Sequence, residues 1–257
     1  MLVLVAAADR ELRPWLERRA ERDGHRPLGQ LKPGTIQQIP DTDDPIAVLC
    51  TGVGLESTRR ALQLLEESHP RLVRHVGFAG GLRAGINAGD VLVVTAVSDQ
   101  VHDPDSGKPP PPPRALPTHL VTPLRSSLAE LPDRMAQGAL LTVSRFIDSA
   151  QQKRQLGLDS GYLACEMEAA LVREAAEALG ATYAGIRGIS DSEDRDVPPK
   201  PPGLTGPDRL QRSLHYLRKP GSVLGAARMI RGSRRAAEAL GRAIPRALDV
   251  LQVFSQP

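Results

Sequence analysis

The sequence has few aromatic residues, little cysteine and no long hydrophobic run. Only 3% of its 257 residues are aromatic, which argues against nucleic-acid binding through stacked bases, since that mode needs several exposed rings. The two cysteines, Cys50 and Cys165, lie among apolar residues. We interpret them as small buried side chains in a reducing compartment, not as a disulfide or a metal site. The apolar run at residues 2–8 is too short to span a bilayer and has no basic leader, so we expect a cytoplasmic protein.

The composition that remains is that of an ordinary globular protein with an uneven charge. At 40% hydrophobic and 25% charged residues, the chain fits one large domain or one domain with an appendage. Of its 33 basic and 30 acidic residues, ten basic and one acidic residue lie between Arg209 and Arg246. The other 23 basic and 29 acidic residues leave the rest of the chain at −6. The basic character therefore belongs to the C-terminal stretch.

Short apolar runs alternate with helical patterns, and this predicts an α/β fold with helices on the faces of a sheet. Substrate sites in such sheets gather at strand ends and the loops beyond them. Two proline-rich segments, residues 102–117 and 196–208, are expected to be extended loops. The predicted strands are 2–8, 46–50, 73–79, 91–97, 139–143 and 182–189, and the predicted helices are 10–22, 55–68, 120–131 and 166–179.

Polar residues follow two of these strands. Ser190 and Asp191 end the strand in "RGISD", where a partly desolvated carboxylate can act as a proton donor near neutral pH. The alternative is that Asp191 caps the following turn. Gly80 and Gly81, in "AGGL", can bring backbone amides close to a sugar or an anion, or can form no more than a tight turn.

Acidic residues also stand at two predicted helix starts. Glu11 follows the first strand, and Glu166 and Glu168 flank Met167 in "EMEAA". Acids in a first helical turn suit the helix dipole, which explains all three without a function. Whether any of them also holds a substrate is open from the residues alone.

Taken together, the motifs resemble the nucleoside phosphorylase/nucleosidase superfamily, most closely its nucleosidase branch, typified by methylthioadenosine/S-adenosylhomocysteine nucleosidases. "AGGL" with "GD" downstream, "SRFI", "EMEAA" and "RGISD" occur in that order, and the resemblance covers about residues 2–195. It implies a single-domain α/β fold with a mixed central sheet flanked by helices. It also implies cleavage of the N-glycosidic bond between ribose and a purine, without a cofactor.

The resemblance assigns the polar residues to roles. Asp191 matches the acid that protonates the departing base, with Ser190 orienting it. Glu168 matches the carboxylate that accepts hydrogen bonds from the ribose 2′- and 3′-hydroxyls, Met167 packs on the sugar, and Glu11 aligns with the carboxylate that activates water. Glu166 has no sugar role in this scheme and is expected to be structural.

The same resemblance marks the apolar walls of the site. Phe146 and Ile147 match the segment that flanks the base, and Ala79 and Gly80 lie in the glycine-rich turn beside the sugar. Phe78 is a departure, because the family usually carries Ser or Thr at this position, facing the water or phosphate. Losing that hydroxyl weakens the case for a phosphate subsite, which needs several donors and positive charge.

Other candidate ligands in the chain are less specific. Arg10, Arg59 and Arg83 could supply charge to a phosphate, but surface positions are the simpler interpretation. His102 and Asp103 are two metal-ligand types without a third, so we expect loop hydrogen bonds and no metal.

The basic tail divides the chain into residues 1–207, the nucleosidase-like domain, and residues 208–257, a basic helical extension. The tail resembles the C-terminal extension of the hopanoid-associated phosphorylase branch, whose proposed substrate is an adenosylated lipid. A basic amphipathic helix can lie on an anionic membrane surface, or it can pack on the body with its arginines paired to the body's acids. Nucleic-acid binding has the least support, because no motif for it is present.

The sequence therefore predicts an enzyme that cleaves an adenosine-type purine nucleoside, with hydrolysis favoured over phosphorolysis. A nucleoside-binding protein without catalysis is the alternative of a different class. From the resemblance we expect a homodimer. The base, the 5′ substituent and the use of phosphate stay open.

Overall fold

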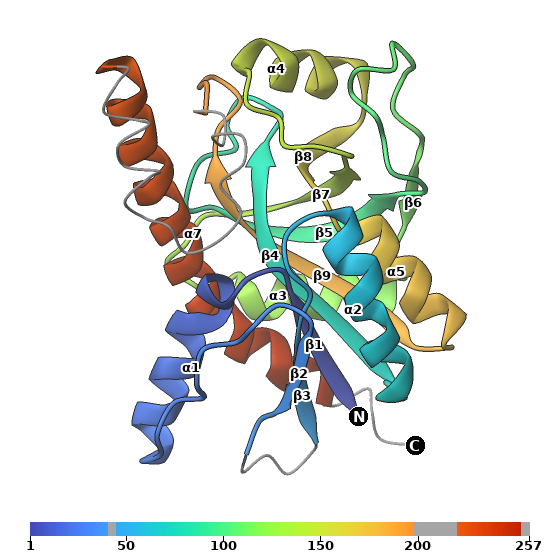
Figure 1. The fold of residues 1–257 in the computed structure, drawn as a ribbon, viewed down its shortest axis with the longest axis vertical. Helices are drawn as coiled ribbons and strands as arrows, with labels where there is room; N and C mark the ends of the chain where they lie inside the picture. The colour runs from blue at the N-terminus through green and yellow to red at the C-terminus, as the bar shows by residue number, and fades with distance from the viewer. Residues whose placement is uncertain (41–44, 198–219, 253–257) are drawn as a thin grey trace.

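The structure is a computed structural model of the chain and describes residues 1–40, 45–197 and 220–252. In these residues, nine strands form one mixed sheet in the order β2-β3-β1-β4-β8-β7-β5-β6, and β9 pairs with both β4 and β5 (Figure 1). The strands are β1 (Leu2–Ala6), β2 (Thr35–Gln38), β3 (Ile46–Cys50), β4 (Leu72–Gly81), β5 (Val91–Ser98), β6 (Pro113–Ala115), β7 (Met135–Thr142), β8 (Tyr162–Glu166) and β9 (Thr182–Asp191).

Helices cover both faces of this sheet. They are α1 (Asp9–Asp23), α2 (Leu55–Glu67), α3 (Thr118–Leu128), α4 (Ala150–Asp159), α5 (Ala169–Ala178) and α7 (Pro220–Gln252). The alternation of side chains along β1 explains the arrangement, since successive residues of a strand point to opposite faces. Val3 and Val5 join the core formed with α2 and α5, whereas Leu4 and Ala6 join the core formed with α1, α3 and α7. The predicted α/β fold with a mixed, helix-flanked sheet is confirmed.

The predicted strands and helices are all present, and the differences lie in their bounds and in elements that sequence patterns missed. β7 begins at Met135, four residues before the predicted start. β2, β6, β8 and α4 were not predicted. The helix predicted from residue 166 begins instead at Ala169, because residues 162–166 form β8, which is paired with both β4 and β7.

The C-terminal helix α7 packs against the body of the molecule. Its described part lies along α1, α3 and β9, and Arg242 forms an ion pair with Asp133 at 2.6 Å. Packing on the body, one of the two main alternatives for the basic tail, is therefore what this part of α7 does. The predicted boundary at residues 207/208 lies outside the described residues. No helix in the described ranges is long and apolar enough to cross a membrane. The buried α7 side chains include Ala236, Ala239, Leu240, Ala243, Ile244 and Ala247.

Candidate active site

Sheet pairing brings two of the predicted motifs into direct contact. In the parallel pair β4–β9, Gly80 of "AGGL" stands opposite Asp191 of "RGISD", next to an irregularity of register after Ala79. A Cβ at Gly80 would lie 3.1 Å from Asp191 Oδ2, so a larger residue there would crowd the carboxyl. The hydroxyl of Ser190 lies 2.6 Å from Asp191 Oδ1 and 3.3 Å from the carbonyl oxygen of Ala79, so its single proton can be donated to either acceptor. Strand pairing and Ser190 thus fix the orientation of the predicted acid.

Glu11 turns back from the first turn of α1 toward the strand ends. Its Oε2 accepts hydrogen bonds from the backbone N–H groups of Ala7 (2.8 Å) and Ala8 (3.0 Å), and its Oε1 accepts one from Phe78 N–H (3.2 Å). The carboxyl lies 3.4 Å from where a Cβ would stand on Gly77. Burial raises the pKa of Glu11, and these backbone donors oppose the rise. Glu11 therefore caps α1 and also presents a buried carboxyl to the end of β4.

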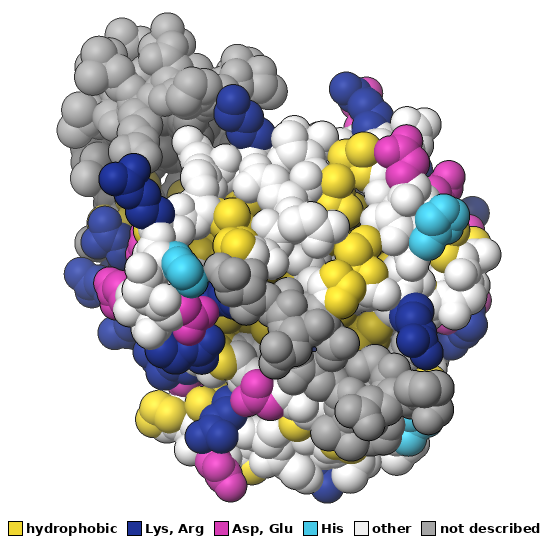
Figure 2. Space-filling view, turned by 90° about the horizontal axis from the view of Figure 1, so that it is seen from below, with side chains coloured by type: hydrophobic (Ala, Val, Ile, Leu, Met, Phe, Trp, Pro, Cys, Tyr) yellow, Lys and Arg dark blue, Asp and Glu magenta, His cyan; other side chains and the backbone are white. Residues whose placement is uncertain are grey.

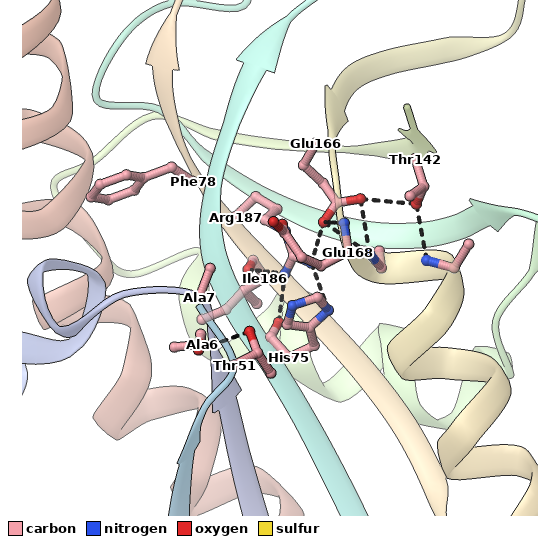
Figure 3. Close-up of polar contacts among 12 residues, drawn as sticks. Ala6, Ala7, Thr51, His75, Phe78, Thr142, Glu166, Glu168, Ile186 and Arg187 are labelled. Carbon is pink, nitrogen blue, oxygen red and sulfur yellow. Dashed lines mark hydrogen bonds and ion pairs between the residues drawn. The ribbon is translucent and has the colours of Figure 1, made fainter. Parts of the chain in front are cut away.

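Glu166 ends β8 and holds the start of α5 (Figure 3). Its carboxylate accepts from the backbone N–H groups of Glu168 and Ala169 and from the hydroxyl of Thr142, all at 2.9 Å. Thr142 Oγ1 in turn accepts from Ala170 N–H at 2.9 Å. This network satisfies backbone donors that every helix N-terminus leaves unpaired. The contacts support the expectation that Glu166 is structural.

Glu168 lies one residue before α5 and points toward the same space. Its Oε1 accepts a hydrogen bond from Gly54 N–H at 2.8 Å, and Gly54 has a φ of 94°, which favours glycine. Its Oε2 accepts no hydrogen bond from the described part of the chain, which leaves that oxygen for a ligand. Burial, with a contribution from the charge of Glu166, raises the pKa of Glu168 to about 8. A raised pKa favours the protonated form of this carboxyl near neutral pH.

Arg187, on β9, is the cation beneath these carboxyls. Figure 3 shows it between Glu166 and His75, with Glu168 alongside. Its guanidinium donates to the His75 carbonyl (2.7 Å) and contacts His75 Nδ1 (2.8 Å) and Glu166 Oε2 (3.4 Å). A guanidinium has no acceptor, so His75 Nδ1 must accept here and the ring is neutral. In agreement, burial and then the charge of Arg187 lower the pKa of His75 well below its usual value.

The other predicted contact residues lie around this cluster. Met167 Cε is 3.6 Å from where a Cβ would stand on Gly54. Ile147 is buried with Cys165 in a small core under β7 and β8, and Met167 packs against that core. Phe146, just before α4, is 39% exposed. The structure therefore places Met167 and Ile147 near Cys165, which stands opposite Gly80 in the pair β4–β8, and leaves Phe146 at the surface.

Phe78 uses its backbone, not its ring, toward the cluster. Its ring points away from Glu166, Glu168 and Arg187 (Figure 3) and lies under the guanidinium of Arg10, at 5.4 Å from the centroid. Its N–H donates to Glu11, as described above. Arg59 and Arg83 are exposed, in agreement with surface positions.

The remaining candidate ligands, His102 and Asp103, form hydrogen bonds within the fold. His102 N–H donates to the Thr142 carbonyl at 2.8 Å, and Asp103 accepts from Asp105 N–H at 3.1 Å, which are the expected loop hydrogen bonds. Among the described residues no group of three or more His, Cys, Asp or Glu is arranged to hold a metal. Cys50 and Cys165 are free and buried, as predicted.

Three contributors to the site were not identified from the sequence. Lys153 reaches Asp191 from α4, Gly54 fixes Glu168, and Thr142 supports Glu166. None of the three left a local signal in the sequence, because each acts on a residue that is distant along the chain. Beside Asp191, between the end of β9 and α7, lies a cavity of about 340 Å³. Its lining includes Ala88, Ser190, Ser192, Arg195, Arg228 and Met229.

Comparison with known proteins places this geometry in a family context. A family model described as the phosphorylase superfamily matches residues 2–205. A 5′-methylthioadenosine/S-adenosylhomocysteine nucleosidase from an Exiguobacterium strain is 32% identical over 164 residues, 59% of this chain and 70% of the relative. One from Chromohalobacter salexigens is 30% identical over 158 residues, 57% of this chain and 66% of the relative.

Solved structures share the fold at low sequence identity. A Helicobacter pylori 5′-methylthioadenosine/S-adenosylhomocysteine nucleosidase complexed with a pyrrolidine-based compound has a TM-score of 0.69 at 16% identity, over 96% of this chain and 97% of that one. The futalosine hydrolase of the same organism has a TM-score of 0.65 at 16% identity, over 96% and 97%. Since the alignments reach nearly the whole chain, the fold is shared throughout most of its length.

Proposed function

Because this chain belongs to the phosphorylase superfamily and is an enzyme that cleaves N-glycosyl bonds of purine nucleosides, we propose that it hydrolyses an adenosine-type nucleoside. The observation that carries the proposal is the placement of carboxyl groups. Asp191 lies against Gly80 at the end of β9, and Glu168 keeps one oxygen without a hydrogen bond from the described residues. This arrangement suits a reaction that needs an acid for the base and an acceptor for the ribose hydroxyls.

The proposed chemistry divides the work among three carboxyl groups. Glu168 accepts hydrogen bonds from the 2′- and 3′-hydroxyls and holds the ribose. Asp191 gives its proton to a ring nitrogen of the base while the bond from C1′ to the base breaks, with its electron pair leaving on the base. The sugar becomes oxocarbenium-like, as in glycoside hydrolysis, and water attacks C1′ while Glu11 takes its proton.

Water is the favoured nucleophile because of what surrounds Glu11. A second anion beside this buried carboxyl would be repelled, and Phe78 supplies a backbone N–H and no hydroxyl. Phosphorolysis is the second candidate, and one observation favours it. The guanidinium of Arg10 lies over the ring of Phe78, within a residue of Glu11 in sequence, and could attract phosphate.

The experiment that tests the acid is Asp191→Asn. An enzyme of this mechanism should lose about 100-fold or more in kcat, while its affinity for the nucleoside, measured by calorimetry, stays within a few-fold. The amide keeps the shape of the side chain but has no proton to give. A kcat close to that of the wild type would contradict the assignment of Asp191. A wild-type protein that binds a nucleoside and never cleaves it would instead be a binding protein.

A lipid-linked nucleoside and a membrane contact are finer proposals about the same enzyme. The first described turns of α7 carry four exposed arginines, Arg228, Arg231, Arg234 and Arg235, and such a stripe attracts anionic lipid. Replacing Arg231, Arg234 and Arg235 by glutamine, and keeping Arg228 because it lines the cavity beside Asp191, should strongly reduce sedimentation with anionic liposomes at low salt and leave turnover of a water-soluble nucleoside unchanged. Equal sedimentation of both proteins would contradict the membrane contact. The homodimer stays a prediction, testable by light scattering.

A further inference from the structure

Lys153 is a buried cation whose three donors are all engaged around Asp191. It lies in the first turn of α4, and its side chain is 1% exposed. Its ammonium forms an ion pair with Asp191 Oδ2 and donates to the carbonyls of Ser192 and Arg195, both at 3.2 Å. A lysine is almost never fully buried unless it is paired. The burial of Lys153 therefore indicates that its charge acts on the Asp191 carboxyl.

Lys153 is not needed to hold the start of α4 against the segment that follows β9. Two other hydrogen bonds already connect the start of α4 to the segment after β9. Ala150 N–H donates to Asp196 Oδ1 and Val197 N–H donates to the Asp148 carbonyl, each at 2.8 Å. Lys153 also stands on the buried face of α4, with Ala150, Leu156 and Gly157. An apolar residue there would complete the packing without the cost of burying a charge.

The result is a carboxyl held from two sides. Ser190 donates to Asp191 Oδ1 at 2.6 Å, and Lys153 pairs with Oδ2. Gly80, which has no Cβ, leaves room for Asp191 Oδ2. Both oxygens of Asp191 therefore have a hydrogen-bonding partner, and one of those partners is a full positive charge whose own side chain is 1% exposed.

We infer that Lys153 is the positioning residue of the acid: it orients Asp191 and stabilises the carboxylate that forms when Asp191 gives its proton to the base. The inference rests on the proposed function. Before the reaction the proton is on Asp191 Oδ1, and the Ser190 hydroxyl donates to the Ala79 carbonyl instead. That proton moves to the ring nitrogen, and the bond from C1′ to the base breaks with its electron pair going to the base. The ionised carboxylate left behind is held by Lys153 at Oδ2, and Lys153 keeps all its protons. A preorganised charge beside a site where negative charge develops lowers the barrier.

A double-mutant cycle tests this inference, because a residue that acts through Asp191 loses its effect when Asp191 is gone. Lys153→Met should lower kcat by about 30-fold or more, within the range of general-acid effects, and leave KM within about threefold. The same change in an Asp191→Asn background should lower kcat by less than about twofold. Arg154→Met is the matched control, since it removes an exposed cation from the next position of α4 and should leave kcat unchanged.

Each result has a distinct meaning. A Lys153→Met protein with wild-type kcat, or with the same fold loss in both backgrounds, overturns the inference. If Asp191→Asn itself keeps wild-type kcat, the proposed function fails first. Thermal unfolding of all variants detects a folding defect, and Lys153→Gln, which keeps donors to the two carbonyls without the charge, replaces Lys153→Met if that protein does not fold. Lys153→Arg should retain more kcat than either neutral variant.

Discussion

Three glutamates and one arginine share a small buried space at the candidate site. Glu11, Glu166 and Glu168 are each at most 7% exposed, and Arg187 beneath them is 1% exposed. One guanidinium cannot neutralise three carboxylates, so the cluster lowers its charge by keeping a proton. Burial raises the pKa of Glu11, and burial and then the charge of Glu166 raise the pKa of Glu168 to about 8, which favours a proton on Glu168 at neutral pH. Ribose hydroxyls would then stabilise the ionised form by donating to it.

The pH dependence of folding stability should reveal the proton on Glu168. The folded-state pKa of Glu168, about 8, lies above its unfolded value. Between pH 4.5 and 8 the folded protein holds a proton that the unfolded chain has lost, so Glu168 makes folding less favourable as pH rises through this window. Glu168→Gln removes that dependence. The Tm difference, variant minus wild type, should rise from pH 5 to 8 and then level off.

The matched control is Glu174→Gln, an exposed glutamate on the neighbouring helix α5. Its Tm difference from the wild type should not change over the same pH range. If Glu168→Gln behaved like this control, a protonated Glu168 in the folded protein would be excluded.

At the scale of elements, the junction between β8 and α5 determines where Glu168 stands. The hydroxyl of Thr142, on β7, accepts from Ala170 N–H and donates to Glu166, and Thr142 is fully buried. This side chain connects the strand to the first turn of the helix that follows Glu168. The position of Glu168, which is predicted to bind the ribose hydroxyls, therefore depends on Thr142 of the neighbouring strand β7.

Thr142→Val should expose that dependence. The change keeps the shape of the side chain and leaves a buried N–H and a carboxylate oxygen with one partner fewer. We expect the free energy of unfolding to fall by about 1–3 kcal/mol and KM for the nucleoside to rise. Urea unfolding and steady-state kinetics measure the two effects. Thr122→Val, at an exposed position of α3, should change neither, and an equal effect of the two substitutions would contradict this account.

The same junction shows what sequence patterns can and cannot give. Polar groups next to apolar runs marked Glu11, Glu168 and Asp191 as candidates, and only the resemblance to a family assigned their roles. The structure brings the three residues to neighbouring strand ends. The helix start was misplaced by three residues because "CEMEAA" has acids before a helical pattern whether residue 166 ends a strand or begins a helix. Long-range strand pairing decided between the two, and pairing leaves no local signal. Lys153 was missed because its partner is 38 residues away.

At the scale of the whole molecule, α7 connects the C-terminal stretch to the candidate site. A Cβ at Gly232 would stand 2.0 Å from the carbonyl oxygen of Ser190, and one at Gly188 would stand 2.7 Å from the carbonyl oxygen of Ala236. The helix thus lies directly on the end of β9. Charge also holds it, through the pair of Arg242 with Asp133. On the face shown in Figure 2, Lys and Arg side chains lie beside Asp and Glu side chains and do not form one continuous basic area.

Because Gly232 of α7 lies against the carbonyl of Ser190, we expect a methyl group added at Gly232 to lower kcat. Gly232→Ala should push the helix from Ser190, lower the free energy of unfolding by about 1–3 kcal/mol, offset by up to about 1 kcal/mol of helix propensity, and reduce kcat. Gly241→Ala is the control. It crowds Pro14 and Arg18 on α1, away from β9, and should affect stability with little change in kcat. Equal kcat losses in the two variants would show that packing alone is responsible.

The measurement that tests the central claim most directly is base release, followed by chromatography, from adenosine, inosine, methylthioadenosine and adenosylhomocysteine, each with and without phosphate. The account predicts that at least one adenine nucleoside releases its base without phosphate and yields a free sugar, because Glu11 activates water. Release only in the presence of phosphate, with a sugar 1-phosphate as product, would contradict hydrolysis and assign the nucleophile to the Arg10 side of the site. No release from any of the four would contradict the proposed substrate class.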